Sequence, residues 1–284
     1  MKQGLYTIKE NRRIARGVYR MVLSGDTSAI TAPGQFVNVQ IEGCFLRRPI
    51  SICDWDEETI TLLYKVVGKG TDKMAAMKVG ETLDLLTGLG NGFNLGSREQ
   101  GTGSRVLIVG GGIGAAPLYG LLKRVQEVQG FKSSRVQEFK GSRVQEFKGS
   151  RVQVVLGAAS KDDLVYIDEF KALGAEVIVT TDDGSEGIHG LVTDAMAGCN
   201  CDYVYCCGPM PMMKAVHRLC KAGQFSLEER MGCGFGACMG CSVEIQGESK
   251  GSPRGVQGEF KGSPRDSKRV CKDGPVFRKE ELVW

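Results

Sequence analysis

Residues 106–114 read Val106-Leu107-Ile108-Val109-Gly110-Gly111-Gly112-Ile113-Gly114, a short apolar run that leads directly into a glycine-rich turn. A helical pattern follows the turn, from Ala115 to about Val128. A strand, a glycine turn and a helix in this order form the context in which a nucleotide phosphate binds at a helix N-terminus. The candidate nucleotide-binding residues of this turn are Gly110, Gly111, Gly112 and Gly114. A glycine turn required only for close packing would leave the same pattern, so both interpretations stay open.

The segment downstream alternates strand-like and helix-like stretches. Apolar strand patterns cover 152–156, 177–180 and 203–206, and helical patterns lie around 164–173, 191–197 and 212–222. This alternation predicts a Rossmann-like domain, in which helices cover both faces of a parallel sheet.

The last of these strands ends in Cys207-Gly208-Pro209, at the carboxyl edge where such sheets bind ligands. Gly208 and Pro209 are therefore candidate cofactor-binding residues. Cys207 is either a catalytic neighbour of a nicotinamide ring or an ordinary buried thiol. An acidic partner for the adenine ribose is expected after the second strand, but residues 157–161 contain none, so the choice between NAD and NADP stays open. Asp182-Asp183-Gly184 reads as a turn.

The residues upstream of the glycine turn have a different pattern. Short stretches rich in Val, Ile, Thr and Tyr cover 5–8, 18–23, 35–41 and 59–67, with Gly, Pro and Asp turns between them. This spacing predicts a small antiparallel β-barrel. Because Gly101-Thr102-Gly103-Ser104 marks a linker, we expect three units: a barrel domain over 1–100, an α/β nucleotide domain over 101–225 and a small module over 226–284.

The expected barrel carries two patterns suited to a flavin dinucleotide. Arg48-Pro49-Ile50-Ser51 offers a guanidinium fork for a diphosphate and a hydroxyl for the redox edge of a flavin ring. Downstream, Leu63-Tyr64-Lys65 is followed by Gly68-Lys69-Gly70-Thr71, a glycine turn whose amides can face phosphate. Each pattern is common alone, and together they indicate FAD.

Cysteines near the end of the sequence have the spacing of iron ligands. Cys233, Cys238 and Cys241 form C-x4-C-x2-C, and Cys271 is a distant fourth. This is the plant-type spacing of a [2Fe–2S] cluster held by thiolates. Glycines between the ligands allow the backbone angles that a loop wrapped around a cluster needs. The alternative is a structural zinc site, although zinc ligands usually come as two close pairs.

Two repetitive segments do not fit these domains. The octapeptide at 134–141 recurs at 142–149, and a degenerate copy lies at 259–265. We interpret 132–151 and 248–268 as surface insertions, flexible or weakly helical. The net charge of +4 lies entirely within 132–151, which makes it weak support for nucleic-acid binding.

The remaining composition indicates a cytoplasmic protein. No run of about 18 apolar residues occurs, and the first residues lead to no apolar signal core, so we expect no membrane segment. Eleven cysteines are many for this compartment. Outside the cluster motif, most of them are expected as small buried side chains.

In this order the motifs resemble the ferredoxin–NADP reductase-like superfamily, and more narrowly the electron-transfer subunits of NAD-linked, type B dihydroorotate dehydrogenases. The resemblance covers essentially the whole chain apart from the two insertions. It implies that FAD is held by Arg48, Pro49, Ile50, Ser51, Leu63, Tyr64, Lys65, Gly70 and Thr71. It also implies that Cys233, Cys238, Cys241 and Cys271 hold a [2Fe–2S] cluster near the contact with a catalytic subunit.

The resemblance further implies what that partner does. The catalytic subunit carries FMN and oxidises dihydroorotate to orotate in pyrimidine (UMP) biosynthesis. Electrons would pass from FMN through the cluster and FAD to NAD+, within a heterotetramer of two subunits of each kind. The sequence shows no general acid–base pair or nucleophile, as expected of a protein that forwards electrons.

Two other functions remain compatible with the sequence. The flavin subunit of an NADH-dependent ferredoxin–NADP oxidoreductase shares the barrel, the nucleotide domain and the cluster. A zinc-stabilised nucleotide-binding regulator would use the same cysteines without flavin or iron. The two insertions depart from the family pattern in either redox case.

Overall fold

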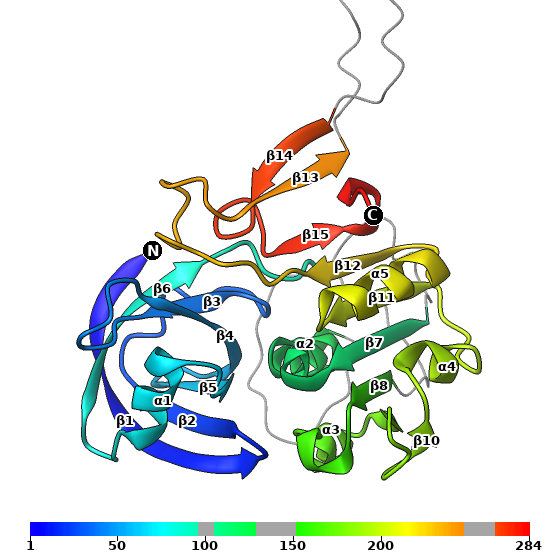
Figure 1. Ribbon diagram of the computed structural model, residues 1–284, viewed down its shortest axis with the longest axis horizontal. Helices are drawn as coiled ribbons and strands as arrows, with labels where there is room; N and C mark the ends of the chain where they lie inside the picture. The colour runs from blue at the N-terminus through cyan, green and yellow to red at the C-terminus, as the bar shows by residue number, and fades with distance from the viewer. Residues whose placement is uncertain (96–104, 129–151, 247–264) are drawn as a thin grey trace, which may run out of the picture.

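The computed structural model describes residues 1–95, 105–128, 152–246 and 265–284. These residues form a closed barrel, a mostly parallel sheet with helices on both faces, and a two-stranded sheet near the C-terminus (Figure 1). The predicted fold class, a β-barrel followed by a Rossmann-like domain and a small C-terminal module, is confirmed.

The N-terminal barrel is antiparallel, in the closed strand order β1-β2-β5-β4-β3-β6. Its elements are β1 (Lys2–Ala15), β2 (Val18–Ser24), β3 (Phe36–Val39), β4 (Arg48–Trp55), β5 (Thr59–Lys65), α1 (Lys69–Ala76) and β6 (Thr82–Leu89). Successive side chains on a strand point to opposite faces, so Val37 and Val39 fill the barrel core while Asn38 lies on the outer face. The four strands expected from the sequence are present, with ends shifted by a few residues.

The nucleotide domain is built on the sheet order β10-β9-β8-β7-β11-β12-β15. Its strands are β7 (Val106–Gly111), β8 (Gln153–Ala158), β9 (Glu176–Thr181), β10 (Ile188–His189), β11 (Tyr203–Cys207), β12 (Gly223–Ser226) and β15 (Val276–Arg278). Its helices are α2 (Ala115–Val128), α3 (Ile167–Ala172), α4 (Val192–Met196) and α5 (Met210–Leu219). Alternation along the strands separates two apolar layers, because Ile108 packs with α2 and α3 whereas Val109 packs with α4 and α5.

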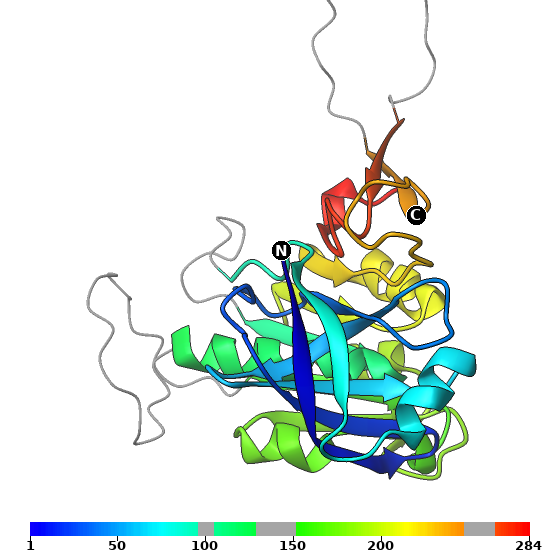
Figure 2. The ribbon, with the colours of Figure 1, turned by 90° about the vertical axis from the view of Figure 1, so that its left-hand side faces the viewer.

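The C-terminal module pairs β13 (Ser242–Gln246) with β14 (Arg265–Arg269). This pair lies above the barrel and the sheet in both Figure 1 and Figure 2. The chain then returns, and β15 pairs antiparallel with β12, so the end of the chain adds a strand to the nucleotide-domain sheet. The domain boundaries near residues 100 and 225 remain predictions.

One expectation about the insertions differs from the structure. Residues 132–151 and 248–264 lie outside the described residues. Residues 265–268, which we expected at the end of the second insertion, form part of β14. The sequence analysis missed this strand because its first residue, Arg265, is also the last residue of the degenerate repeat copy.

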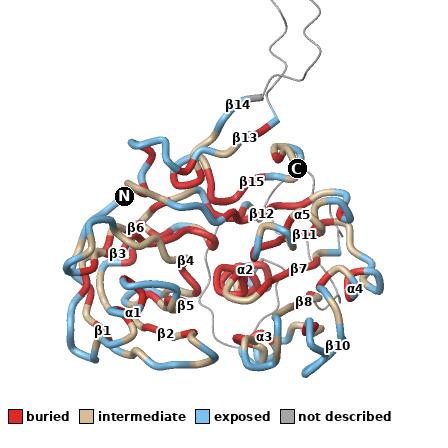
Figure 3. Tube along the Cα trace, in the orientation of Figure 1, coloured by how far each residue is buried: buried red, intermediate tan, exposed pale blue. Residues whose placement is uncertain are grey.

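The barrel and the nucleotide domain share one continuous apolar core. The barrel residues Val18, Cys53 and Leu63 belong to the same buried cluster as Leu118 and Leu121 of α2. Figure 3 shows α2 largely buried where it lies between the barrel and the sheet. Because the two domains are packed together, loops from both can contribute to one site. Within the described ranges, no helix combines the length and the hydropathy that crossing a bilayer requires.

Candidate functional site

A cavity of about 790 Å³ opens at the carboxyl edge of the parallel sheet. Its lining includes Gly111, Gly112, Ala158, Thr180, Asp182 and Pro209. These residues end or follow β7, β8, β9 and β11, so the cavity lies where open α/β sheets bind ligands. Its size is suited to a bound nucleotide.

The glycine turn contributes to this cavity with only some of its members. Gly111 and Gly112 line the cavity, and Gly112 has a positive φ of 53°. A Cβ at Gly114 would lie 2.4 Å from the carbonyl oxygen of Cys207, and one at Gly110 would lie 2.8 Å from Leu156. Gly110 and Gly114 are therefore required for packing, whereas Gly111 and Gly112 remain candidates for nucleotide binding. Gly208 packs on the backbone of Gly111.

Asp182 is a candidate ligand-binding residue that sequence analysis missed. It follows β9, lines the cavity, and its backbone N–H donates to the carbonyl oxygen of Ala158 (3.1 Å). We looked for an acidic residue after the second strand, but the structure places one after the third strand of the domain. The signal was the turn Asp182-Asp183-Gly184 itself, which follows a strand at the ligand-binding edge.

The barrel supplies cationic groups to the same cavity. Arg16 and Lys65 line it, and both pair with Asp163, for which the Lys65 Nζ to Asp163 Oδ1 distance is 3.9 Å. The hydrogen bond from the Arg16 guanidinium lowers the pKa of the Asp163 carboxyl below its usual value. Lys65, which the sequence assigned to the flavin, therefore lies beside the nucleotide cavity. Arg16 was not predicted, because nothing in its local sequence indicates a ligand.

The predicted flavin-binding residues Arg48, Gly70 and Thr71 come together next to β4. A Cβ at Gly70 would lie 2.4 Å from the Arg48 Nε, so only a glycine lets the guanidinium lie against the start of α1. The Thr71 hydroxyl accepts hydrogen bonds from the backbone N–H groups of Val67 (3.0 Å) and Gly68 (3.3 Å), which fixes the turn before the helix. A guanidinium beside backbone amides at a helix start is a chemically suitable cradle for a diphosphate.

The other predicted flavin-binding residues differ in where their side chains point. Pro49 and Ser51 lie on the outer face of β4, where they pair with Asn38 and Phe36 of β3. Ile50 packs against the barrel core.

Two residues of β5 are buried. Leu63 packs in the core shared by the two domains. Tyr64 is 1% exposed, and its hydroxyl donates to Asn11 Oδ1 (2.9 Å). The ring of Tyr64 therefore serves the barrel core, and only its backbone is available to a ligand.

Cys207 lies at the end of β11 and is 1% exposed. Burial, and then the nearby Glu228 carboxylate, raise the pKa of its thiol, while a hydrogen bond from Ser226 acts in the opposite direction. The thiol is therefore protonated at neutral pH and is not a nucleophile. Cys207 is not among the described residues that line the cavity.

The predicted cluster ligands come as two pairs of thiols. The Cys238 thiol lies close enough to lower the pKa of Cys233, and the Cys241 thiol lies close enough to raise that of Cys271. The backbone N–H of Cys271 also points at the Cys241 Sγ (3.4 Å). The pairs are close enough for the charge of Cys241, and then of Cys233, to raise the pKa of the Cys271 thiol, which burial also raises.

The loop around Cys233 favours its thiolate. Burial raises the pKa of Cys233, but hydrogen bonds from the backbone of Phe235, from Cys238 and from the backbone of Ala237 lower it to about 6. The Ala237 and Cys238 N–H groups lie 3.2 and 3.4 Å from the Sγ. Thiolate is the form that binds metal, and N–H groups directed at sulfur stabilise a reduced cluster.

The pairing of the thiols distinguishes two kinds of metal site. In the described part of the chain, no three His, Cys, Asp or Glu side chains are grouped to hold a single ion. A zinc site needs its ligands around one point, whereas a [2Fe–2S] cluster contains two irons, each bound by two thiolates. The arrangement of the cysteines in two pairs is the one that a binuclear cluster needs.

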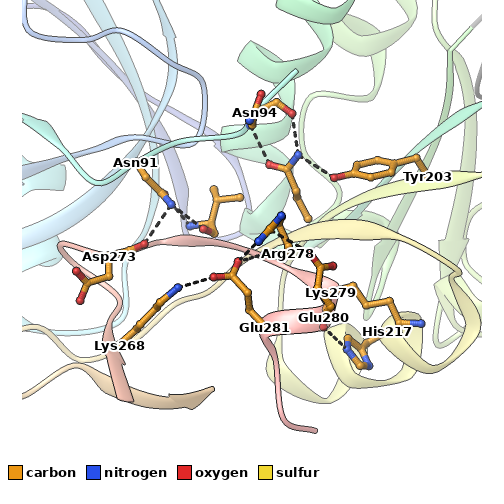
Figure 4. A network of polar contacts seen from close by, with 12 residues as sticks. Asn91, Asn94, Tyr203, His217, Lys268, Asp273, Arg278, Lys279, Glu280 and Glu281 are labelled. Carbon is orange, nitrogen blue, oxygen red and sulfur yellow. Dashed lines mark hydrogen bonds and ion pairs between the residues drawn. The ribbon is translucent and has the colours of Figure 1, made fainter. Parts of the chain in front are cut away.

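A polar network fixes the segment that follows Cys271; Figure 4 shows the contact of Asn91 with Asp273 in this network. Asn91, which follows β6, donates to the carbonyl oxygens of Asp273 (3.2 Å) and Val276 (2.8 Å) and accepts from the Val276 N–H (3.1 Å). Arg269 joins the carbonyl oxygen of Gly236 (2.8 Å) to the Asp273 carboxylate (3.0 Å). These bonds join the barrel, the loop 233–241 (the cysteine loop) and the C-terminal segment 265–284 (the tail) around the Cys271 thiol.

Two ion pairs of this network lie within the C-terminal segment, between Lys268 and Glu281 (2.6 Å) and between Arg278 and Glu280 (3.0 Å). His217 of α5 then ties this segment to the nucleotide domain. His217 contacts the carbonyl oxygen of Lys279 (3.0 Å) and packs against Phe225 and Trp284, so its role is structural.

Comparison with protein families identifies two segments of the chain. Residues 228–283 match the iron-sulfur cluster binding domain of dihydroorotate dehydrogenase B. Residues 108–218 match the oxidoreductase NAD-binding domain. The first segment contains all the paired cysteines, and the second contains the glycine turn and most of the cavity lining.

Curated relatives match over nearly the full length. The electron transfer subunit of dihydroorotate dehydrogenase B (NAD(+)) from Caldanaerobacter subterraneus subsp. tengcongensis is 39% identical, over 98% of this chain and 97% of the relative. The subunit of the same name from Shouchella clausii is 39% identical, over 99% and 98%.

Solved structures agree with the fold. A structure of the NADH-dependent reduced ferredoxin-NADP oxidoreductase matches with a TM-score of 0.75 and 30% identity, over 99% of this chain and 90% of that chain. Phthalate dioxygenase reductase, at 17% identity and a TM-score of 0.54, shares the fold over 77% of this chain.

Proposed function

The chain belongs to the family of electron transfer subunits of NAD(+)-linked dihydroorotate dehydrogenase B, and from this premise we propose that it carries electrons from a dihydroorotate-oxidising partner to NAD+ in pyrimidine biosynthesis. The observation that carries this proposal is the joining of three sites in one rigid framework. The flavin cradle begins on β4, which packs against α2 of the nucleotide domain. The nucleotide cavity is lined by residues of both barrel and sheet, and the loop of the paired thiols contacts Asn38 of the barrel.

Each site has its own binding residues in this proposal. Arg48, Gly70 and Thr71 hold the FAD diphosphate, and Pro49, Ile50 and Ser51 form the strand beside it, with the backbone of 63–65. The NAD site uses Gly111, Gly112, Gly208, Pro209 and Asp182. A flavin exchanges a hydride or two single electrons, and a [2Fe–2S] cluster passes one at a time, so together they join nicotinamide chemistry to one-electron transfer.

The end of the cavity that follows β11, lined by Pro209 and Met212, is assigned to the nicotinamide. Cys207 ends β11, and Glu228 follows β12, where desolvation by the surrounding protein raises the pKa of its carboxyl. The neutral Cys207 thiol is buried behind this end of the cavity, outside the described lining, and does not attack the ring. This chain then needs no nucleophile of its own.

We further propose that the cysteine loop is the face toward the partner. Cys238 is exposed, and the apolar side chains of Phe235 and Met239 beside it are 45% and 52% exposed. Exposed apolar side chains next to a redox group are suited to docking a second protein. The partner in this proposal is an FMN-containing catalytic subunit, in a heterotetramer of two subunits of each kind.

The cellular setting follows from the cysteines. None of the eleven forms a disulfide, as in a reducing compartment, and we place the protein in the cytoplasm.

In this proposal the domains at 1–100, 101–225 and 226–284 each hold one redox group.

One observation favours a second function. The solved NADH-dependent reduced ferredoxin-NADP oxidoreductase is similar over almost the whole chain. The same three sites would serve a flavin subunit in such an enzyme, with a different partner at the cysteine loop.

Coexpression with an FMN-containing dihydroorotate-oxidising subunit tests the proposal. We expect a complex that reduces NAD+ with dihydroorotate, and the catalytic subunit alone should not. In the complex, Cys241→Ser should abolish NAD+ reduction while dihydroorotate oxidation by an artificial dye continues. NADP+ reduction that requires ferredoxin, with no activity on dihydroorotate, would instead support the second function.

A further inference from the structure

Asn38 lies between β4, the strand that carries the proposed flavin-binding residues 48–51, and the cysteine loop. On β3 it pairs in register with Pro49 of β4 and with Leu86 of β6. Its side chain is on the outer face of the barrel, yet the residue is 1% exposed. Something outside the barrel therefore covers it, and that cover is the cysteine loop.

The contact between Asn38 and the loop is direct. The Asn38 Nδ2 donates to the carbonyl oxygen of Cys233 at 3.0 Å. Gly234 packs on the same amide so closely that a Cβ there would lie 2.3 Å from the Nδ2. The first cluster ligand is thus fastened to the barrel through one carboxamide, across 195 positions of sequence.

Asn38 itself cannot shift easily. Arg47 donates from its Nη1 to the backbone carbonyl oxygen of Asn38 (3.2 Å) and to the Asp84 carboxylate (2.9 Å). Both neighbours of Asn38 on the strand are buried in the barrel core. Its amide is therefore a fixed point from which the loop can be positioned.

The amide makes this contact at a cost. Among the described residues, no group donates to the buried Asn38 Oδ1. A buried acceptor without a partner is unfavourable, and a leucine of similar size would avoid that penalty. Rotating the amide would not help, because it would place the Oδ1 against the carbonyl oxygen of Cys233. An amide at this position is explained by the donor that it presents to the loop.

We propose that Asn38 is a positioning residue that fixes Cys233, and with it the cluster, relative to the flavin-binding strand. The inference rests on the proposed function. Because electron transfer between two bound groups depends on their separation and orientation, loss of this contact alters transfer between flavin and cluster while both groups remain bound.

Two nearly isosteric substitutions test this proposal in the holoprotein purified without oxygen. Asn38→Leu removes both the donor and the unpaired acceptor, and Asn38→Asp replaces the amide donor with a carboxyl group that can also bring a negative charge to the Cys233 carbonyl oxygen. Thr87→Val is the matched control, because Thr87 is also fully buried but bonds within the barrel, to the carbonyl oxygen of Lys2. The measurements are FAD, iron and sulfide content, melting temperature, flavin reduction by NADH, electron arrival at the cluster by freeze-quench, and the EPR spectrum of the reduced cluster.

In both Asn38 variants we expect wild-type FAD content, unchanged flavin reduction by NADH, an altered EPR spectrum, and flavin-to-cluster transfer slowed roughly tenfold or more. Asn38→Leu should be at least as stable as Asn38→Asp, so the electron-transfer defect will not follow stability. Thr87→Val should change stability only.

The possible results distinguish failure of the proposed function from failure of the positioning role of Asn38. A wild-type protein without flavin or without iron and sulfide would overturn the proposed function, and the inference with it. A wild-type protein that holds both, with Asn38→Leu matching it in EPR spectrum and transfer rate, would overturn the positioning role alone. A defect that only follows the loss of stability, in Thr87→Val as much as in the Asn38 variants, would also overturn it.

Discussion

We expect Asp182, which lines the cavity, to decide which nicotinamide dinucleotide binds there. A carboxylate after β9 can accept hydrogen bonds from the ribose hydroxyls of NAD, and it repels the additional phosphate of NADP. Asp182→Ser should raise the KM for NADH roughly tenfold or more and leave the KM for NADPH unchanged or lower. Steady-state kinetics with a dye as electron acceptor provide the measurement.

Asp183→Ser is the matched control for that prediction. Its carboxylate bonds the Ser185 hydroxyl within the turn (2.6 Å), and Asp183 is not among the described residues that line the cavity. An equal loss of NADH affinity in both variants would show that the turn, and not the Asp182 carboxylate, matters.

Gly234 is constrained by both its backbone and its surroundings. Its φ is +79°, and any Cβ would collide with Asn38. Gly234→Ala should lower the iron and sulfide content of the purified protein, because the loop must move away from the barrel. Gly174→Ala has a similar φ of +82° with nothing within 4 Å, so it should cost only about 1 kcal/mol in stability and leave iron content unchanged. Full iron content in Gly234→Ala would contradict the close contact.

At the scale of elements, the tail that carries Cys271 depends on Asn91. Three hydrogen bonds join this side chain to Asp273 and Val276. Asn91→Ala should lower the free energy of unfolding by about 1–3 kcal/mol and reduce iron retention, because the fourth thiol loses its support. Iron analysis after gel filtration, beside a melting curve, provides the measurement.

Asn11→Ala is the matched variant within the barrel. Asn11 also makes three side-chain hydrogen bonds, to the carbonyl oxygens of Met74 and Met77 and from the Tyr64 hydroxyl. It should lose comparable stability and some FAD while keeping its iron. Iron loss of the same size in both variants would point to general unfolding instead of a local support.

Local patterns predicted the elements of this fold well. The run Val106–Val109 and the glycines after it identified β7 and the start of α2, because hydrophobic period and turn chemistry are local properties. The cysteine spacing likewise identified the paired thiols. The role of β15 could not be predicted, since its pairing with β12 joins segments about 50 residues apart and depends on the tertiary fold.

Site residues were predicted where a motif carries them and missed where the fold assembles them. Arg48 and Gly70 were found from short patterns, and the structure brings them together. Asn38 and Arg16 have no local signature, because each acquires its role from a distant contact. Asp182 had a signal in the turn after its strand, but the residues alone did not show which side of the sheet that turn lines. Tyr64 shows the reverse case: its neighbours form a motif, but strand alternation turns its ring into the barrel core.

At the scale of the whole molecule, ion pairs between barrel and nucleotide domain make stability depend on pH. The hydrogen bond from Arg16 lowers the pKa of Asp163. A carboxyl whose pKa is lower in the folded state adds stability above its unfolded pKa of about 3.9, and loses it as the pH falls through the folded value. The melting temperature should therefore be level near neutral pH and fall below about pH 4.

Asp163→Asn should lower the melting temperature at pH 7. It should also make the decrease of the melting temperature between neutral pH and pH below 4 smaller than in the wild type. Asp168→Asn is the control, because the Asp168 side chain is 96% exposed and should change neither value. An unchanged acid profile in Asp163→Asn would show that this pair does not join the two domains energetically.

In the proposed function, this one chain exchanges electrons between a nicotinamide, a flavin and a binuclear iron centre. Anaerobic titration of the purified chain with NADH, followed by absorption and EPR spectroscopy together, measures this directly. The predicted result is one FAD and one [2Fe–2S] cluster per chain, with NADH bleaching the flavin and producing the EPR signal of a reduced binuclear cluster. A colourless protein with one zinc per chain, or a cluster that NADH leaves oxidised while the flavin is reduced, would contradict it.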